Sequence, residues 1–485
     1  MDKKQEYSSI DLHHHSKYSY EAPKATLPVK EILEYYRQLA ETKNERVIED
    51  GKEKLLPKRV AFSICDHDSS EGAYYAWKYI NENPQKYKGF DFIPGIELGV
   101  NCHRALVYSD PSHRDDKYVF KHMHILAHAK PGKEKEFFKK TFAISILNKM
   151  VIDPDKNNVY DKSVIALEKQ QKQNKYISIG GQILAGRNML FDKYSVKIPF
   201  DKYLSCVKDG ASYEEIRNIF LEVSFKYIVS HTNAFNKKTK GEALQEISRA
   251  ISYKQNINNS RPIPIFPKKP QIIQDLVSLN KIDILELNEI LGDSATICFA
   301  HPHTLGIHNK TNIAVKDFKD VDISILPPEV QEKINNKLNN PNEFANGWFS
   351  TNDIMDTTGK YKIKGDWLGL VCFQIFYNKL LEKGVKIDGF EMTRTYDRKD
   401  KMEKVLDVVM DKYNLAVSYG TDDHFNSEDK YYFEDLKNRP ESVKKESYFS
   451  SHNMFATESS YFKLNRSGKE KLKPEENEVT FMFTK

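Results

Sequence analysis

Seven short runs of apolar, β-branched and aromatic residues recur along this chain, and each one ends in or carries His, Asp or Glu. They cover residues 8–12, 59–65, 90–96, 122–127, 296–300, 387–390 and 415–421. Runs of this length and composition are typical of buried strands. Helix-like segments lie between several of them, at residues 28–42, 70–83, 272–291 and 399–413. This succession predicts an α/β fold with a parallel sheet and a functional site at the carboxyl ends of its strands.

The first of these runs leads into three consecutive histidines. Residues 8–12 read as a strand, and His13, His14 and His15 follow directly. Because residues i and i+2 of an extended chain project to the same side, His13 and His15 can reach one metal ion while His14 points the other way. An exposed loop is the alternative for a His run taken alone, and the later strand ends favour the metal site.

The composition is that of a chain with a substantial core and no strong charge bias. Of the 485 residues, 39% are hydrophobic and 12% aromatic, and the formal net charge is +5, which permits an anionic substrate without requiring one. The length suits one large barrel with insertions, or two to three ordinary domains. Five scattered cysteines without C-x-x-C spacing favour buried thiols in a reducing compartment. With no apolar signal-peptide core and no apolar run near the ~18 residues of a membrane span, we expect a cytoplasmic protein.

Two stretches interrupt the alternation of strands and helices. Residues 141–270 contain helical pieces at 212–223 and 241–252, a Gly180–Gly181 turn and a strand at 226–230, and residues 305–384 are rich in Asn, Lys and Asp. We interpret both as insertions at the rim of a barrel, where long additions are tolerated and can shape a substrate site. The predicted organisation is a barrel built from residues 1–140, 271–304 and 385–430, the two insertions 141–270 and 305–384, and a C-terminal extension over 431–485.

Six strand-end motifs occur in the order found in one known superfamily. They are Asp11-x-His13-x-His15-Ser16, Cys65-Asp66-His67, Pro94-Gly95-x-Glu97, His124-Ile125-Leu126, Ala300-His301-Pro302 and Gly420-Thr421-Asp422-x-His424. Each is weak alone, and together they make the chain resemble the PHP superfamily, named for polymerase and histidinol phosphatase. Cys65 departs from the threonine of the family's T-D-H element. The resemblance leaves both insertions unmatched.

The resemblance implies a distorted (β/α)7 TIM-like barrel with two or three divalent metal ions, Zn, Mn or Fe, at its C-terminal mouth. Carried over motif by motif, the metal ligands would be His13, His15, His67, Glu97, His124, His301, Asp422 and His424. Many members have an acid a few residues beyond the first His pair; Tyr20 stands there in this chain, and Glu21 beside it is the candidate ligand of a third metal. Imidazole and carboxylate donors without thiolates suit these metals.

Four residues receive roles around the metals. Asp66 is expected to orient a His ring, and Asp68 to cap the helix expected from residue 70. His424 is a candidate ligand and also a candidate proton donor to the leaving group. Arg394, just beyond a strand end, could clamp a phosphate, and a surface salt bridge is its equally supported alternative.

The implied activity is hydrolysis of a phosphate ester by a metal-activated water, without a covalent intermediate. A phosphodiesterase or nuclease acting on DNA, RNA or a nucleotide is the leading hypothesis, because aromatic residues in and around the insertions could stack on bases. One alternative is a small-molecule phosphomonoesterase of the histidinol phosphatase type, and another is a non-catalytic PHP interaction module. The insertions could also recruit a protein partner, and no membrane partner is expected.

Overall fold

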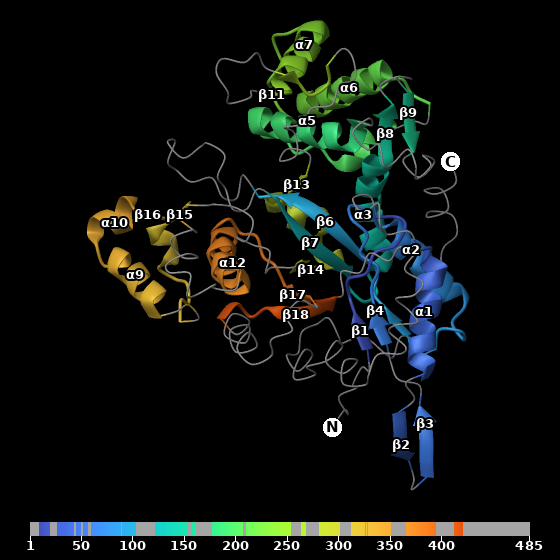
Figure 1. The fold of residues 1–485 in the computed structure, drawn as a ribbon. Coiled ribbons are helices and arrows are strands. Elements are labelled where there is room, and N and C mark those ends of the chain that lie inside the picture. The colour runs from blue at the N-terminus through green and yellow to red at the C-terminus, as the bar shows by residue number, and fades with distance from the viewer. Residues whose placement is uncertain are drawn as a thin grey trace.

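A mixed α/β fold is seen in the computed structural model of this chain (Figure 1). The structure describes residues 9–19, 27–42, 45–49, 52–56, 60–88, 90–102, 122–153, 158–161, 177–206, 210–253, 263–267, 281–300, 312–324, 326, 328–350, 365–393 and 412–420. The first of the two three-stranded sheets and the six-stranded sheet contain the strand-end motifs, and the other described sheets have two or three strands.

The three-stranded sheet is built from the first apolar runs. Its strands run parallel in the order β1 (Ser9–Asp11), β4 (Val60–Phe62) and β5 (Phe90–Phe92). α1 (Val29–Thr42) follows β1, and α2 (Glu71–Glu82) follows β4. α1 buries Ile32 and Tyr36, one turn apart on the same face, and the Tyr36 ring stacks on Phe62 with 4.5 Å between centroids. The predicted strand and helix succession is therefore confirmed for this part.

The six-stranded sheet has the order β13-β6-β7-β14-β17-β18. Its strands are β6 (Gly95–Asn101), β7 (His122–Ala129), β13 (Ile282–Asp283), β14 (Ala295–Phe299), β17 (Gly389–Thr393) and β18 (Ala416–Gly420). β7 runs antiparallel to both of its neighbours, while the other described pairs in this sheet are parallel. The prediction of a wholly parallel sheet is wrong at β7, because an apolar run identifies a strand but not the direction in which it enters the sheet.

Among the residues that the structure describes, the two sheets meet beside His67 and beside His13. His67 forms an isolated parallel bridge with Glu97 in β6, and the Asp68 amide donates to the Glu97 carbonyl over 2.7 Å. On the other side β1 lies against β18, where a Cβ added to Gly420 would overlap His13. Within the described residues the strands form two adjoining sheets and not one closed, hydrogen-bonded barrel.

The described part of residues 141–270 is mostly helical. Its elements are α3 (Glu134–Lys149), β8 (Met150–Asp153), β9 (Asn158–Asp161), β10 (Ile177–Ser178), α5 (Ile179–Tyr194), the 3₁₀ helix η4 (Phe200–Cys206), α6 (Tyr213–His231), α7 (Lys240–Ala250), β11 (Ser252–Tyr253) and β12 (Ile263–Pro264). α5, α6 and α7 lie together at one end of the molecule (Figure 1).

Two local predictions for this stretch are wrong. Gly180 and Gly181 lie in α5 rather than in a turn, and residues 226–230 are the last turns of α6 rather than a strand. α6 starts at a capping box formed by Ser212 and Glu215. The buried face that begins there continues at helical spacing to Ile228, and this packing outweighs the β-branched and aromatic composition of the last turns.

The remaining elements lie outside the central sheets. They are the hairpin β2 (Glu45–Glu49) and β3 (Lys52–Leu56), the short helices η6 (Ile284–Glu286), α8 (Leu287–Leu291) and η7 (Gly292–Ser294), and then β15 (Asn312–Ala314), η9 (Val315–Phe318), α9 (Pro328–Leu338), α10 (Pro341–Asn346), β16 (Trp348–Ser350) and α12 (Gly365–Glu382). Of the helix predicted over 272–291, residues 272–280 lie outside the described residues, and the described remainder contains β13, η6 and α8. Most of the helix predicted over 399–413 also lies outside the described residues.

Four cysteines are described with their side chains, and all four are buried as predicted: Cys65, Cys102, Cys206 and Cys298. Burial raises the pKa of the Cys65 and Cys206 thiols, so both stay protonated at neutral pH. Of the described helices, none combines the length and the apolar composition that crossing a membrane requires.

Candidate metal centre

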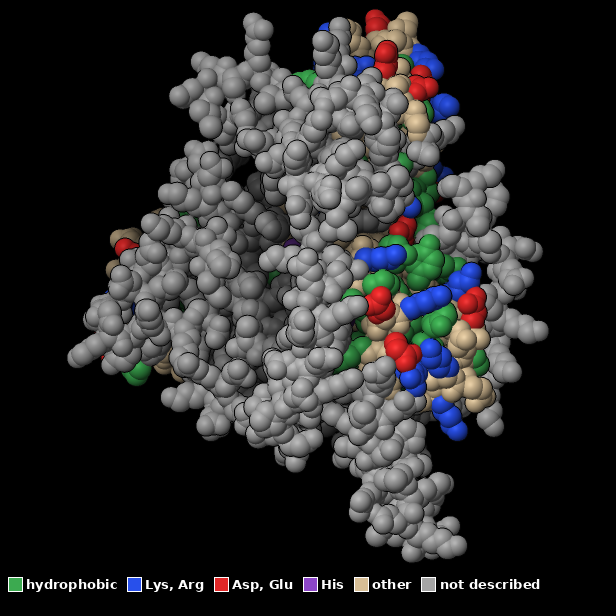
Figure 2. All heavy atoms as spheres, turned by 45° about the vertical axis from the view of Figure 1, so that its right-hand side comes forward, with side chains coloured by type: hydrophobic (Ala, Val, Ile, Leu, Met, Phe, Trp, Pro, Cys, Tyr) green, Lys and Arg blue, Asp and Glu red, His purple; other side chains and the backbone are tan. Residues whose placement is uncertain are grey.

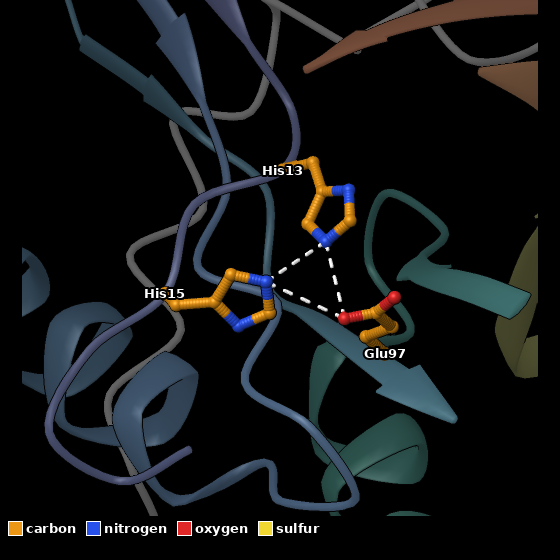
Figure 3. Close-up of side chains that lie close together, drawn as sticks. All are labelled: His13, His15 and Glu97. Carbon is orange, nitrogen blue, oxygen red and sulfur yellow. Dashed lines mark hydrogen bonds and ion pairs between the residues drawn. The ribbon is translucent and has the colours of Figure 1, made fainter. Parts of the chain in front are cut away.

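His13 and His15 reach the centre because the chain stays extended after β1. Both side chains are fully buried, and their Nε2 atoms face each other 3.1 Å apart (Figure 3). His14 packs instead against α1, where its ring meets Tyr36 edge-on with 5.8 Å between centroids. The alternation predicted from the sequence therefore separates His14 from the pair.

Glu97 lies between two pairs of histidines. Its Oε2 is 3.2 Å from His13 Nε2, 3.4 Å from His15 Nε2 and 2.8 Å from His67 Nδ1, and its Oε1 is 2.8 Å from His124 Nδ1. His13, His15 and Glu97 form one group of donors, and His67, His124 and Glu97 form a second, each with donor atoms within 4.8 Å of one another. One carboxylate is thus shared by two groups that could each hold an ion.

The spacing of the first group fits a metal ion. In a tetrahedral site with bonds of about 2.0–2.1 Å, neighbouring donor atoms are about 3.3 Å apart, and the distances among His13, His15 and Glu97 are 3.1, 3.2 and 3.4 Å (Figure 3). A cation satisfies two imidazole nitrogens and a carboxylate oxygen that converge on one point. The 2.8 Å contacts of His67 and His124 are hydrogen-bond distances, so that group is the more contracted of the two.

The charge on Glu97 also suits a cation. Burial raises the pKa of this carboxyl, but electrostatic interaction with the imidazoles of His124, His13 and His67 outweighs burial and holds the pKa well below its ordinary value. Glu97 therefore stays ionised inside the protein. A fully buried carboxylate surrounded by imidazoles is an electrostatic site for divalent ions.

Two side chains hold the outer nitrogens of the His pair. Glu391 in β17 is buried, and its Oε1 is 2.7 Å from His13 Nδ1. Ser19 Oγ is 3.2 Å from His15 Nδ1 and accepts the His67 amide hydrogen over 3.0 Å. A carboxylate at Nδ1 keeps that nitrogen protonated and leaves Nε2 as the acceptor that faces the centre. The sequence places Glu391 at a strand end but does not predict its contact with His13. It does not predict the contact of Ser19 with His15 either, and the only sequence signal for that contact is the four-residue spacing between them.

Asp66 holds the turn after His15. Its Oδ1 accepts the Ser16 amide hydrogen over 2.5 Å, and its Oδ2 accepts the Ser16 hydroxyl over 2.8 Å. Burial raises the pKa of Asp66 to about 7, against the lowering effect of these two hydrogen bonds. Gly72 lets α2 lie against this pair, since a Cβ there would overlap Asp66. The expectation that Asp66 orients a His ring is wrong about the partner, because Ser16 occupies the carboxylate.

Asp68 does not cap α2, which begins at Glu71 after Ser70. The Asp68 backbone is left-handed, with φ of 51°, and its side chain turns toward the six-stranded sheet. Its Oδ1 accepts the Gly99 amide hydrogen over 3.1 Å, and its Oδ2 lies 3.4 Å from Lys281 Nζ. These contacts anchor the residue next to His67 to the sheet that carries Glu97.

A neutral histidine lies next to the centre. His128 in β7 is fully buried, its Nε2 donates to the Leu12 carbonyl over 2.8 Å, and the same nitrogen is 3.5 Å from Cys65 Sγ. Burial lowers the pKa of His128 to about 4, so the ring is uncharged at pH 7. His128 therefore supports the backbone that precedes His13.

The structure brings together five of the predicted ligands, namely His13, His15, His67, Glu97 and His124. The other predicted site residues, Glu21, His301, Arg394, Asp422 and His424, lie outside the described residues. Their roles, and with them a third metal site, stay predictions.

Comparisons with known proteins leave the family open. No protein-family model matches the chain, and no curated protein matches it. Among solved structures, the chain is similar to an amidohydrolase from Chromobacterium violaceum, solved with bound sulfate and no metal. The two are 14% identical, the alignment covers 87% of this chain and 89% of that one, and the TM-score is 0.29. A similarity of this strength does not establish a shared fold.

Proposed function

We propose that this protein is a metal-dependent hydrolase of phosphate esters with a site of the PHP type. The observation that carries the proposal is the buried carboxylate of Glu97, which two groups of His nitrogens share at 2.8–3.4 Å. Divalent ions held by such groups lower the pKa of a bound water and neutralise charge on a phosphate oxygen. The order of the sequence motifs supports phosphate esters over other substrates.

Among the described side chains that form it, the metal centre is accessible to solvent from one side only. The side chains of His13, His15 and Glu97 have no exposed surface, whereas those of His67 and His124 are 11% and 23% exposed. A substrate therefore approaches from the side of His67 and His124. The fixed nitrogens of His13 and His15 keep their orientation during this approach, because Glu391 and Ser19 contact their outer sides.

The test combines metal analysis with a substrate panel. We expect the purified chain to bind two Mn²⁺ or Zn²⁺ ions, one for each described group of donors, and to hydrolyse p-nitrophenyl phosphate, methyl p-nitrophenyl phosphate or an oligonucleotide only when loaded. Preference for the monoester would indicate a small-molecule phosphatase, and preference for the diesters would indicate a phosphodiesterase.

The matched variants are Glu97→Gln and Glu136→Gln. Glu97 joins both donor groups, whereas Glu136 is an acid on the surface of α3 that pairs with Lys133 and Lys140. We expect Glu97→Gln to abolish metal binding and hydrolysis, and Glu136→Gln to keep both. A loaded enzyme that cleaves amides and no phosphate ester would contradict the proposal, and full metal content in Glu97→Gln would contradict the site.

A further inference from the structure

A pocket of about 350 Å³ lies between the turn that follows His15 and helices α1 and α2. Three tyrosines and three lysines form most of its lining, namely Tyr18, Tyr75, Tyr79, Lys17, Lys30 and Lys78. Figure 2 shows this side of the molecule, where hydrophobic, basic and acidic side chains lie together over α1 and α2. A volume in this range suits a small molecule or a single unit of a polymer.

The tyrosines provide a surface on which a flat ring can stack. The Tyr18 and Tyr75 rings stack on each other with 5.2 Å between centroids and 29° between planes. Of the phenylalanines, tyrosines and tryptophans that the structure describes, only Tyr75 is exposed, at 38%. Aromatic side chains of this kind bind nucleic-acid bases without regard to sequence, because every base has a π-face.

The lysines give the pocket an excess of positive charge. Lys78 forms a 3.9 Å ion pair with Glu82, also in the lining. Neither Lys17 nor Lys30 pairs with a described carboxylate. The ammonium of Lys17 lies 5.2 Å from the centre of the Tyr18 ring, and that of Lys30 lies 4.9 Å from the Tyr79 ring. Two cations that pair with no carboxylate among the described residues, beside an aromatic surface, suit an aromatic ligand that carries negative charge.

One tight turn joins this pocket to the metal centre. The turn runs from Ser16 to Ser19, closed by the Ser19 amide, which donates to the Ser16 carbonyl over 3.0 Å. Ser19 contacts His15 and His67 in the centre, while Tyr18, the residue before it, lines the pocket. Tyr18 is three positions after His15, so their Cα atoms are at most about 11 Å apart. A substrate with one phosphate at the centre could place its neighbouring unit in the pocket.

We infer that this pocket binds one nucleotide of the substrate, with the base on Tyr75 and the phosphates facing Lys17 and Lys30. The inference rests on the proposed phosphoesterase function, since it places the scissile phosphate at the metal centre. It assigns the substrate to single-stranded nucleic acid or a nucleotide diester. Neither the metal ions nor their ligands take part in this contact.

A pair of substrates with the same leaving group tests the inference in the loaded enzyme. Thymidine 5′-(p-nitrophenyl phosphate) carries a base, and methyl p-nitrophenyl phosphate does not. We expect Tyr75→Ala to raise KM for the thymidine ester about tenfold, the loss typical of one stacked base, and to leave the methyl ester unchanged. Tyr75→Phe keeps the ring and should restore KM. An equal effect of Tyr75→Ala on both esters, or on neither, overturns the inference.

Binding to the metal-free protein supplies a readout that is independent of turnover. The probe is a fluorescein-labelled oligothymidylate of five nucleotides, followed by anisotropy over a range of NaCl concentrations. Each phosphate contact contributes about 0.7 to the slope of log K against log salt for single strands. We therefore expect the double variant Lys17→Ala, Lys30→Ala to lower that slope by about 1.4, and the surface control Lys133→Ala to leave it unchanged. An unchanged slope in the double variant overturns the inference.

The two proposals fail separately. If the oligonucleotide binds through Lys17 and Lys30 but the loaded enzyme cleaves no phosphate ester, the pocket stands as a nucleotide site and the phosphoesterase function is wrong. If both esters are hydrolysed with equal KM in wild type and Tyr75→Ala, the function stands and the pocket is not part of the substrate site.

Discussion

Two of the buried charge clusters among the described residues balance their charge in different ways. In the first, Arg187 of α5 donates to Glu286 over 2.7 Å and to the Ile198 carbonyl over 2.5 Å, and its guanidinium lies 4.3 Å from the centre of the Phe200 ring. One cation therefore meets one anion inside the protein. This pair connects the helices of residues 141–270 to the segment that follows β13.

The second cluster surrounds Glu97, whose carboxylate contacts four imidazoles; one of these, His13, also contacts Glu391, and no Lys or Arg takes part among the described contacts. Imidazoles carry positive charge only when protonated, so this cluster becomes neutral by gaining protons or by binding a cation. The comparison teaches that burial of charge alone does not mark a functional site. A functional site is instead indicated by metal-donor atoms that converge on one point and have no Lys or Arg side chain among their described partners.

The largest expected difference between the clusters comes from removing one carboxylate charge from each. Glu97→Gln should weaken metal binding by more than about 100-fold, because it removes the donor shared by both groups. Glu286→Gln should leave metal binding intact and lower the free energy of unfolding of the metal-free protein by about 3 kcal/mol, since Arg187 loses its partner. Metal titration and urea unfolding of both variants measure the two effects. Loss of metal binding in Glu286→Gln would show that the Arg187–Glu286 pair is not separate from the metal centre.

A smaller effect is expected from the contact between β18 and the first His pair. A Cβ at Gly420 would overlap His13 and the Glu391 carboxylate, whereas a Cβ at Gly241 in α7 meets nothing within 4 Å. Gly420→Ala should therefore shift His13, weaken metal binding about tenfold, as loss of a supporting contact does, and destabilise the fold by about 1–3 kcal/mol. Gly241→Ala is the matched control; it should leave metal binding unchanged and stabilise the fold by up to about 1 kcal/mol, the opposite sign, because alanine favours the helix. Normal metal affinity in Gly420→Ala would show that His13 is not held by this contact.

The smallest effect concerns the neutral histidine beside the centre. Because the pKa of His128 is lowered to about 4 in the folded protein, the unfolded chain binds a proton first as the pH falls below about 6.5. Its contribution to stability is thus present above pH 6.5 and is lost toward pH 4. Between pH 7 and pH 5 the metal-free wild type should lose about 2 kcal/mol more than His128→Gln, whose amide can also donate to the Leu12 carbonyl. Urea unfolding at both pH values measures this, and parallel losses would contradict the buried, neutral state of His128.

The sequence predicted the parts of the site that depend on local geometry. Alternation along an extended chain separates His14 from His13 and His15, and the structure shows the same separation. α1 and α2 begin and end within one or two residues of their predicted bounds, because amphipathic spacing is itself a local property. The predicted strand at 226–230 is wrong because the prediction gives local composition more weight than the helix to which these residues belong. Its composition favours a strand, but a helix that starts at residue 213 continues through it.

Contacts between distant segments could not be predicted in this way. Glu391 reaches His13 across 378 positions of sequence, and the pairing of Asp66 with Ser16 spans 50. The direction of β7 and the pocket between the first turn and two helices likewise depend on how elements pack. No local periodicity encodes such distances, because they depend on the positions of whole strands and helices.

By itself the sequence determined which residues are chemically equipped to bind a metal and where along each apolar run they stand, because strand periodicity and donor chemistry are local. Only the tertiary structure decided that Glu97 is the donor shared by four histidines, and that Ser16, Ser19 and Glu391 hold the surrounding groups in place. The physical reason is that two separate sheets have to adjoin before the histidines that follow β1 and β4 meet the side chains that β6 and β7 carry.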